Sequence, residues 1–181
     1  MSTTTPILGP ELREEIQDMR ARYPMPRSAL LNALHRVQDV LGWVPPEAQH
    51  EVAELFGIPA ADVESVVTFY YMYHRRPVGR YVFKVCRSIS CWLRGSDSIT
   101  AHLKARLGVE VGQTTPDGLF TLLEGECLAA CGGAPALQVN DRYFEAATPE
   151  AVDELLEALR RGEGPFPAAP VSWTRPEEAS R

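Results

Sequence analysis

Four cysteines are the residues of this sequence best suited to chemistry, and they form two tight pairs. Four residues separate Cys86 from Cys91, and three separate Cys127 from Cys131. The N-terminal segment lacks the features of a signal peptide, and no apolar run approaches the roughly 20 residues that span a bilayer. We therefore expect a soluble cytosolic protein, in which paired cysteines serve more often as metal ligands or redox groups than as disulfides.

The spacing within each pair favours one kind of metal site. Four converging thiolates bind zinc or an iron–sulfur cluster. Structural zinc sites prefer C-x2-C at both ends, whereas these wider gaps suit a [2Fe–2S] cluster, whose bridging sulfides spread its ligands apart. The spacing therefore favours [2Fe–2S], with zinc and thiol chemistry as alternatives. Thiol–disulfide exchange is weakened because C-x-x-C is absent, although a disulfide between Cys127 and Cys131 is sterically conceivable.

Several neighbours of the cysteines could assist such a site. Gly132 and Gly133 could let backbone N–H groups approach the sulfurs and adopt positive φ in a tight loop, or form a plain glycine-rich turn. Two arginines near the first pair could offset the negative charge of a cluster, and two glutamates near the second pair would oppose its reduction: Arg87, Arg94, Glu124 and Glu126. No histidine adjoins a cysteine pair, so we expect an all-cysteine site and assign core or surface positions to His35, His50, His74 and His102.

Residues 1–77 have a helical period and almost no strand signal, which predicts an N-terminal helical domain. We expect a first helix with Leu12, Ile16 and Met19 on one stripe, ended by Pro24 and Pro26. A second helix should begin near Ser28, end near Gly42, and bury Leu30, Leu31, Leu34, Val37, Val40 and Leu41. Two prolines, Pro45 and Pro46, should open a third helix that ends at Gly57 and turns Val52, Ala53, Leu55 and Phe56 inward.

The fourth expected helix, PAADVESVVTFYYMYHRRP, starts at Pro59 and is apolar on most sides. One face carries Val63, Val66, Val67 and Tyr70, while Phe69, Met72 and Tyr73 occupy others. A helix of this kind is normally buried on most sides. It is therefore either the central helix of a small bundle or a helix that also docks a partner protein.

Residues 78–162 have a different pattern, in which strands and helices alternate. RYVFKVC and LFTLLEGEC read as strands on either side of the helix SDSITAHLKARLG, and PALQV and RYFEA as a hairpin around Asn140 and Asp141. Thr148 and Pro149 should cap and open a last helix through Leu155, Leu156 and Leu159. This order predicts a thioredoxin-like layer whose first two strands are parallel. Residues 163–181 are a proline-rich extended tail, either disordered or an arm laid on a partner.

The expected fold is α+β, a helical bundle followed by a thioredoxin-like α/β domain. One cysteine pair follows each of the first two strands. Because parallel strands present their C-terminal ends at one edge of a sheet, both pairs should arrive at the same place.

The segment DGLFTLLEGECLAACGGAP resembles the signature D-x-x-F-[S/T]-x5-C-[apolar]-G-x-C-x-x-[G/A]-P of the thioredoxin-like [2Fe–2S] subunit of respiratory complex I, the E subunit of NADH:quinone oxidoreductase, also called subunit 2. The matching residues are Asp117, Phe120, Thr121, Cys127, Leu128, Cys131, Ala134 and Pro135. Ala129 departs from the pattern where the family usually has glycine, which puts in doubt a close backbone approach there but not a ligand. With YPMPRSALLNALHRVQDVLGWVP, VESVVTFYYMYHRRPVGRY and the first cysteine pair, the resemblance covers roughly residues 10–162.

This resemblance implies an electron-transfer subunit that is not catalytic alone. Its four ligands to one [2Fe–2S] cluster would be Cys86, Cys91, Cys127 and Cys131. NADH and FMN would bind to the neighbouring flavoprotein subunit, which would exchange single electrons with the cluster and contact the helical half and the tail. Other partners would be further subunits of the peripheral arm, on the cytoplasmic side of the bacterial inner membrane, with no nucleic acid and no direct membrane insertion. The sequence agrees, because no G-x-G-x-x-G follows a strand.

Three rival functions stay open at this point. The same fold and cysteine pattern occur in the diaphorase subunit of soluble NAD-linked hydrogenases and formate dehydrogenases. HEVAELFGIPAADVESVVTFY has the look of a helix-turn-helix, which would suit a cluster- or zinc-containing DNA-binding regulator. Against it, Asp62 and Glu64 begin the would-be recognition helix, and the chain carries a net charge of −6. The third rival is a binding module structured by zinc.

Overall fold

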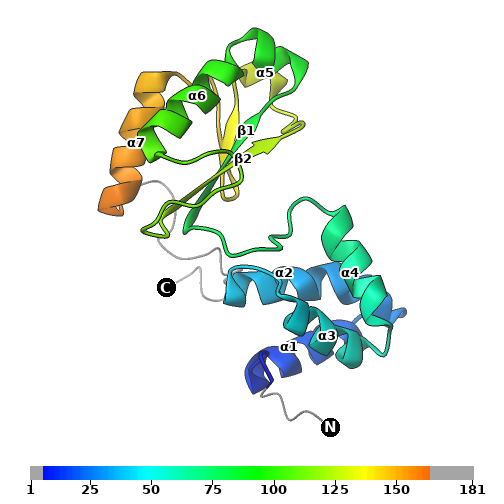
Figure 1. The fold of residues 1–181 in the computed structure, drawn as a ribbon. Coiled ribbons are helices and arrows are strands. Elements are labelled where there is room, and N and C mark those ends of the chain that lie inside the picture. The colour runs from blue at the N-terminus through cyan, green and yellow to red at the C-terminus, as the bar shows by residue number, and fades with distance from the viewer. Residues whose placement is uncertain (1–5, 164–181) are drawn as a thin grey trace. The chain divides into compact units, whose positions relative to one another are not determined.

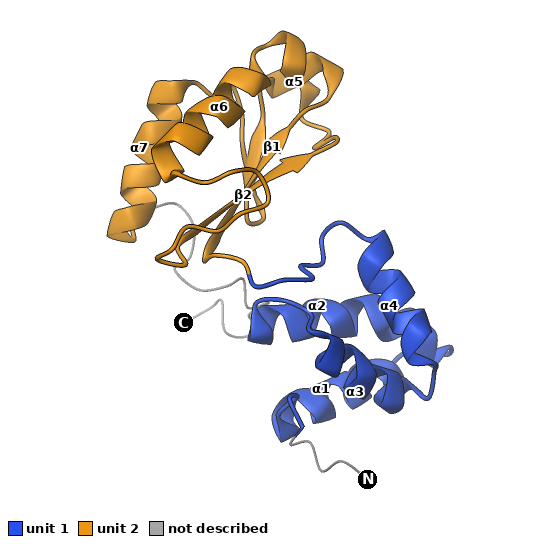
Figure 2. Cartoon of the chain, in the orientation of Figure 1, with its two compact units in different colours: residues 1–77, 172–181 blue, residues 78–171 orange. Residues whose placement is uncertain are grey.

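The computed structural model describes residues 6–163, which form two compact units, residues 6–77 and residues 78–163 (Figure 1, Figure 2). The first unit is all helical and the second is built on a sheet. None of the helices in the described range is long and apolar enough to cross a bilayer. The tail expected over 163–181 lies, beyond its first residue, outside the described residues.

The helical unit follows the predicted boundaries closely. It consists of α1 (Pro10–Ala21), a 3-10 turn η1 (Pro26–Ala29), α2 (Leu30–Leu41), α3 (Pro46–Phe56) and α4 (Ala60–Phe69). Glycines in the left-handed conformation end α2 and α3, as predicted. One predicted core residue of α2 is wrong: Val40 is 50% exposed, because it lies just beside the buried stripe that runs through Leu34 and Val37.

The fourth helix is shorter than predicted, because the chain leaves the helix after Phe69 and Tyr70 is extended. Tertiary contacts hold the segment that follows: the Gln38 side chain donates to the carbonyl of Met72 at 3.1 Å and accepts from the N–H of His74 at 2.6 Å. The buried Tyr73 hydroxyl donates to the carbonyl of Leu31 at 2.9 Å. These bonds replace the helical ones that the sequence pattern predicted.

The second unit has the predicted order of strand, helix, strand, hairpin and helix, with one further short helix directly after the first strand. Its elements are β1 (Tyr81–Cys86), α5 (Ile89–Leu93), α6 (Ser96–Leu107), β2 (Phe120–Gly125), a 3-10 turn η2 (Cys131–Gly133), β3 (Leu137–Val139), β4 (Arg142–Phe144) and α7 (Pro149–Arg161). The strand order is β2-β1-β3-β4, with β1 and β2 parallel and the other pairs antiparallel. This is the α+β fold expected from the sequence.

The core of this unit lies between one face of the sheet and the helices α6 and α7 (Figure 1). Alternate residues of β1 point into it, among them Phe83, which pairs in register with Leu122 of β2 and Val139 of β3. Because β1 is central and buried, its end is held firmly. The same register sets Cys86 opposite Gly125, so the two cysteine-bearing loops leave the sheet side by side.

Thr148 forms the predicted cap of α7, its hydroxyl accepting a hydrogen bond from the N–H of Ala151 at 3.2 Å. We expect Thr148→Ala to lower the free energy of unfolding by about 1 kcal/mol, since the substitution leaves that N–H without its partner. Urea denaturation followed by circular dichroism measures the change. Thr148→Ser keeps the hydroxyl and should unfold close to the wild-type midpoint; equal midpoints for the alanine variant and the wild type would contradict the assignment.

Candidate metal centre

The end of the β1–β2 ladder positions both cysteine pairs. Cys86 is the last residue of β1, and α5, the short helix after it, carries Cys91. The second loop begins where β2 ends at Gly125, passes through Cys127 and enters the 3-10 turn at Cys131. All four cysteines are free thiols. The parallel pairing therefore delivers the pairs to one edge of the sheet, as the order of the elements predicted.

The four thiols are not equivalent. Cys86 and Cys91 are buried, at 3% and 2% exposure, and their thiols are hydrogen-bonded to each other. Cys131 is exposed but close enough to Cys91 for their thiolate charges to repel, and Cys127 is exposed as well. Within residues 6–163, no three His, Cys, Asp or Glu side chains gather closely enough to hold a metal ion as they stand. The arrangement is thus a buried pair with an exposed pair on the adjoining loop.

Backbone N–H groups are directed at three of the four cysteine sulfurs. The N–H groups of Ser88 and Leu128 point to the Cys86 sulfur, and that of Ala136 points to Cys91. In the second loop the N–H of Ala129 donates to the sulfur of Cys127 at 3.4 Å. Hydrogen bonds to sulfur stabilise negative charge on it and are one of the means by which proteins set iron–sulfur potentials. Donors from both loops therefore favour thiolate ligands here.

These surroundings shift the pKa values of the two buried thiols in opposite directions. Burial tends to raise the pKa of Cys86, but the N–H donors of Ser88 and Leu128, with the Cys91 thiol and the Ser88 hydroxyl, outweigh it and hold the pKa below its usual value. Burial raises the pKa of Cys91, and the bond to Cys86 and the negative charges of Cys86 and Cys131 raise it further against the N–H of Ala136. The structure thus makes Cys86 the more acidic member of the buried pair.

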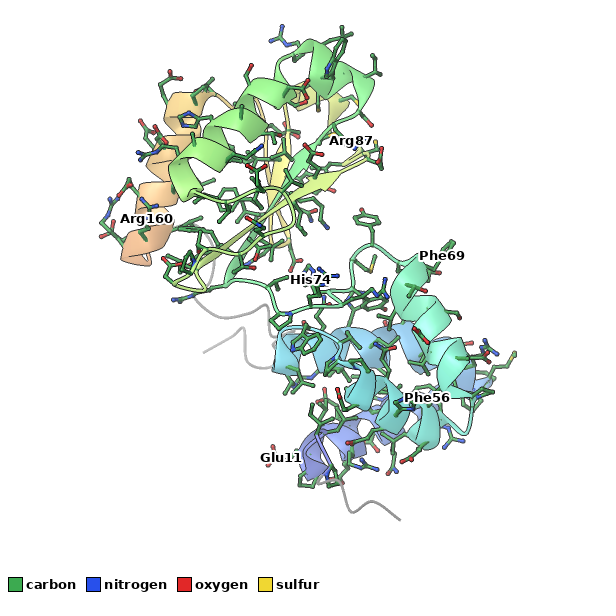
Figure 3. All side chains as sticks on the ribbon, viewed as in Figure 1. Glu11, Phe56, Phe69, His74, Arg87 and Arg160 are labelled. Carbon is green, nitrogen blue, oxygen red and sulfur yellow. The ribbon has the colours of Figure 1, made fainter. Side chains whose placement is uncertain are left out.

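The donor set fits a cluster held by thiolates. It offers four soft sulfur ligands, two from each of two adjoining loops, with N–H groups from both loops available to the sulfurs. Leu128 and Ala136 pack on Cys86 and Cys91 and shield this pair from water. Arg87, which lies near the end of the sheet in Figure 3, contacts two carboxylates at 3.8 and 3.5 Å, those of Glu124 and Glu126. From the sequence, we expected the arginine and the two glutamates to act on a cluster separately. In the structure their opposite charges partly cancel.

The double glycine differs from the prediction. Neither Gly132 nor Gly133 has a positive φ, because the 3-10 turn that contains them is right-handed. The left-handed residue of this loop is instead Ala129, at φ 57°. At Gly133 an added Cβ would lie 2.5 Å from the Cβ and Cδ atoms of Glu145. Gly133 is therefore required by close packing, whereas Gly132 faces open space.

Ala129 brings its backbone close to Cys127 despite lacking the glycine usual at this position, and it adopts a strained backbone to do so. The left-handed conformation destabilises the folded state by roughly 1–2 kcal/mol for a non-glycine residue, and glycine would remove this cost. Against that gain, glycine gives the unfolded chain more conformational freedom, which lowers the free energy of unfolding by about 0.4–1 kcal/mol. We expect Ala129→Gly to raise the free energy of unfolding by about 0.5–1 kcal/mol. Ala130→Gly, at φ −106°, should lower it. Chemical denaturation of both variants checks the sign; destabilisation by Ala129→Gly would contradict this account.

The sequence did not predict a role for Ser88 or Ala136. Both contribute largely through their backbone N–H groups, and residue type gives no signal for such a contribution. For Leu128 a signal existed, the apolar position after the third cysteine of the signature. Two of the histidines make structural contacts. His35 packs on Tyr73, and the His102 ring is hydrogen-bonded to Asp153 at 2.9 Å between α6 and α7.

A mixed sheet that brings two cysteine pairs to the end of adjacent parallel strands defines a thioredoxin-like domain adapted to thiolate ligation. The profile of the thioredoxin-like [2Fe-2S] ferredoxins matches residues 16–160. The chain belongs to this family.

Curated relatives resemble the chain over most of its length. An NADH-quinone oxidoreductase E subunit of Rhizobium meliloti (strain 1021) is 42% identical over 152 residues, which cover 84% of this chain and 90% of the relative. The E subunit of the same enzyme from Pseudomonas aeruginosa is 43% identical over 152 residues, covering 84% and 92%. That of Escherichia coli (strain K12) is 45% identical over 148 residues, covering 82% and 89%. These relatives are, by name, subunits of an oxidoreductase complex.

Among solved structures, the crystal structure of an NAD+-reducing [NiFe]-hydrogenase in the air-oxidised state superposes with a TM-score of 0.65. The superposition covers 73% of this chain and 23% of that chain, at 23% sequence identity. At this identity the likeness shows a shared fold and nothing about activity.

Proposed function

We propose that this chain is the [2Fe–2S] electron-transfer subunit of an NADH:quinone oxidoreductase. One cluster would be held by Cys86, Cys91, Cys127 and Cys131. One observation carries the proposal: the loops that leave the adjacent ends of β1 and β2 each supply two free thiols, and N–H donors from both loops are directed at sulfur. Support also comes from the 42% and 45% identity to E subunits of NADH-quinone oxidoreductases.

When bound, such a cluster accepts and returns one electron at a time. The chain would act by holding its ligands as thiolates and by keeping water from the buried side of the site. Leu128 and Ala136 would exclude water from Cys86 and Cys91, and the N–H groups of Ser88 and Leu128 would stabilise charge on Cys86. In this scheme the chain carries electrons for the assembled complex and is not catalytic alone.

The electron partner we propose is a flavoprotein subunit that binds NADH and FMN. The exposed apolar side chains that directly follow Cys91 on α5, Trp92 at 54% and Leu93 at 70% exposure, would suit a protein contact close to the thiols. In the helical unit Phe69, 80% exposed at the end of α4 (Figure 3), and Tyr71, 67% exposed, would suit a second contact. We place the assembled chain in the peripheral arm, on the cytoplasmic side of the membrane.

We also propose a division of labour along the chain. Residues 1–77 would act as a docking domain, residues 78–162 as the ferredoxin domain, and residues 163–181 as an extended tail. The compactness of the two units within the described range supports separate roles for them.

Anaerobic purification of the full chain tests the cofactor. We expect about two irons and two labile sulfides per chain, a coloured protein, and an EPR signal after reduction. Zinc in place of iron, or no metal, would overturn the proposal. Co-expression with candidate flavoproteins then tests the assembly: co-purification with quinone oxidoreductase subunits supports it, while co-purification with a hydrogenase or formate dehydrogenase would assign the chain to that diaphorase instead.

A further inference from the structure

Residues 87 and 88 tie the two cysteine loops together. The N–H of Arg87 donates to the carbonyl of Gly125 at 2.9 Å, which extends the β1–β2 ladder by one bond past its end. At the next residue, the Ser88 hydroxyl donates to the carbonyl of Glu126, the residue directly before Cys127. The first loop is thereby joined to the backbone that leads into the second cysteine pair.

The same hydroxyl lies within hydrogen-bonding reach of the Cys86 sulfur, to which the backbone N–H of Ser88 also points. Ser88 is half-buried, and its side chain stands between a sulfur of the first pair and the peptide preceding the second. A hydroxyl has a single proton, so it can donate fully to only one of these two acceptors at a time.

Ser88 stands at the start of a helix, where a serine hydroxyl normally has a different hydrogen-bond partner. Ser88 is the N-cap residue of α5, with the extended backbone of that position, and its carbonyl accepts from the N–H of Trp92 at 2.9 Å. A serine here usually caps the helix by accepting a hydrogen bond from a backbone N–H of the first turn. The Ser88 side chain makes no such cap bond. Its hydroxyl instead donates across the site to the carbonyl of Glu126, with the Cys86 sulfur also within its reach.

We propose that Ser88 is a positioning residue of the cluster site, which sets the approach of the two cysteine loops and tunes the charge on the Cys86 ligand through its hydroxyl. This inference rests on the proposed [2Fe–2S] function. A donor to a ligand sulfur stabilises the reduced, more negative state, so it raises the reduction potential. The bond to Glu126 limits the separation of the loops, so it slows their opening and the loss of the cluster.

Three variants of the full chain, purified anaerobically with their cluster, test this inference. Ser88→Ala removes the hydroxyl, Ser88→Thr keeps it, and Ser90→Ala makes the same change on α5 two residues away. The midpoint potential is measured by redox titration with EPR detection, and cluster stability by the rate of bleaching with an iron chelator. A role in packing alone would leave the midpoint potential where it is.

For Ser88→Ala we expect a more negative midpoint, by up to a tenfold change in the redox equilibrium or about 59 mV for one electron, and bleaching several-fold faster. Ser88→Thr and Ser90→Ala should match the wild type in both measurements. Wild-type values for Ser88→Ala would overturn the inference. If Ser88→Ala folds but holds no cluster, Ser88→Thr must restore it, and a threonine variant without cluster counts against the inference. A wild-type chain that binds no iron is a different result, because it overturns the proposed function itself.

Discussion

Replacing Cys127 or Cys131 with alanine is expected to abolish cluster binding while leaving the chain folded. Both thiols are exposed, so their removal opens no cavity in the core. Each would supply one of two ligands to an iron. Because even outer partners of metal ligands contribute about 10–100-fold to metal affinity, the loss of a ligand should cost at least about 100-fold. Iron and sulfide analysis, with visible and EPR spectra after reconstitution, measures the effect.

The buried pair should respond differently to the same change. Removing Cys86 or Cys91, which pack with Leu128 and Ala136, should lose the cluster and also destabilise the apoprotein by about 1 kcal/mol or more. Circular dichroism of the metal-free variants separates the two effects, and Ser90→Ala is the matched control. Full iron and an unchanged spectrum in the Cys127 or Cys131 variant would remove that residue from the ligand set.

Gly133→Ala is expected to damage the second cysteine loop, whereas Gly132→Ala should be tolerated. A Cβ at residue 133 would lie 2.5 Å from the Cβ and Cδ atoms of Glu145, and the nearby backbone is fixed by a 2.7 Å bond from the N–H of Ala146 to the carbonyl of Gly133. Because a Cβ so close to another Cβ cannot be relieved by a flexible side-chain end alone, the backbone must shift. Overpacking of this kind costs about 1–3 kcal/mol.

The two glycine variants form a matched pair, since they add the same methyl group at adjacent positions. At residue 132 an added Cβ meets nothing within 4 Å, and neither glycine has a positive φ. We expect a lower urea midpoint and faster cluster bleaching for Gly133→Ala alone. Equal losses in both variants would show that flexibility of the double glycine matters more than packing at residue 133. In a third variant, Glu145→Ala combined with Gly133→Ala removes the contact with Cδ but keeps the contact with Cβ, so it should recover only part of the loss.

Much of the fold could be read from the chain, because its signals are local. Prolines and glycines mark the ends of helices, apolar residues repeat with the helical period, and the strands are rich in β-branched and aromatic residues. These signals correctly predicted the strands and the two long helices of the second unit, including the Thr148 cap and the hairpin at Asn140, but not the short helix α5 that carries Cys91. The predicted end of α4 was wrong, because long-range hydrogen bonds to Gln38 and Leu31 determine where the helix ends. No local sequence pattern encodes these bonds.

By itself the sequence determined the four thiols, their pairing along the chain and the family to which they point. Types and spacings are properties of the chain, and the β-α-β order already brings both pairs to one sheet edge. Only the tertiary structure decided which pair is buried, which N–H groups reach sulfur, and that Ala129 rather than a glycine takes the left-handed turn. Those features depend on the packing of one loop on another, as between Gly133 and Glu145 or Ser88 and Glu126, and such contacts join residues far apart in sequence.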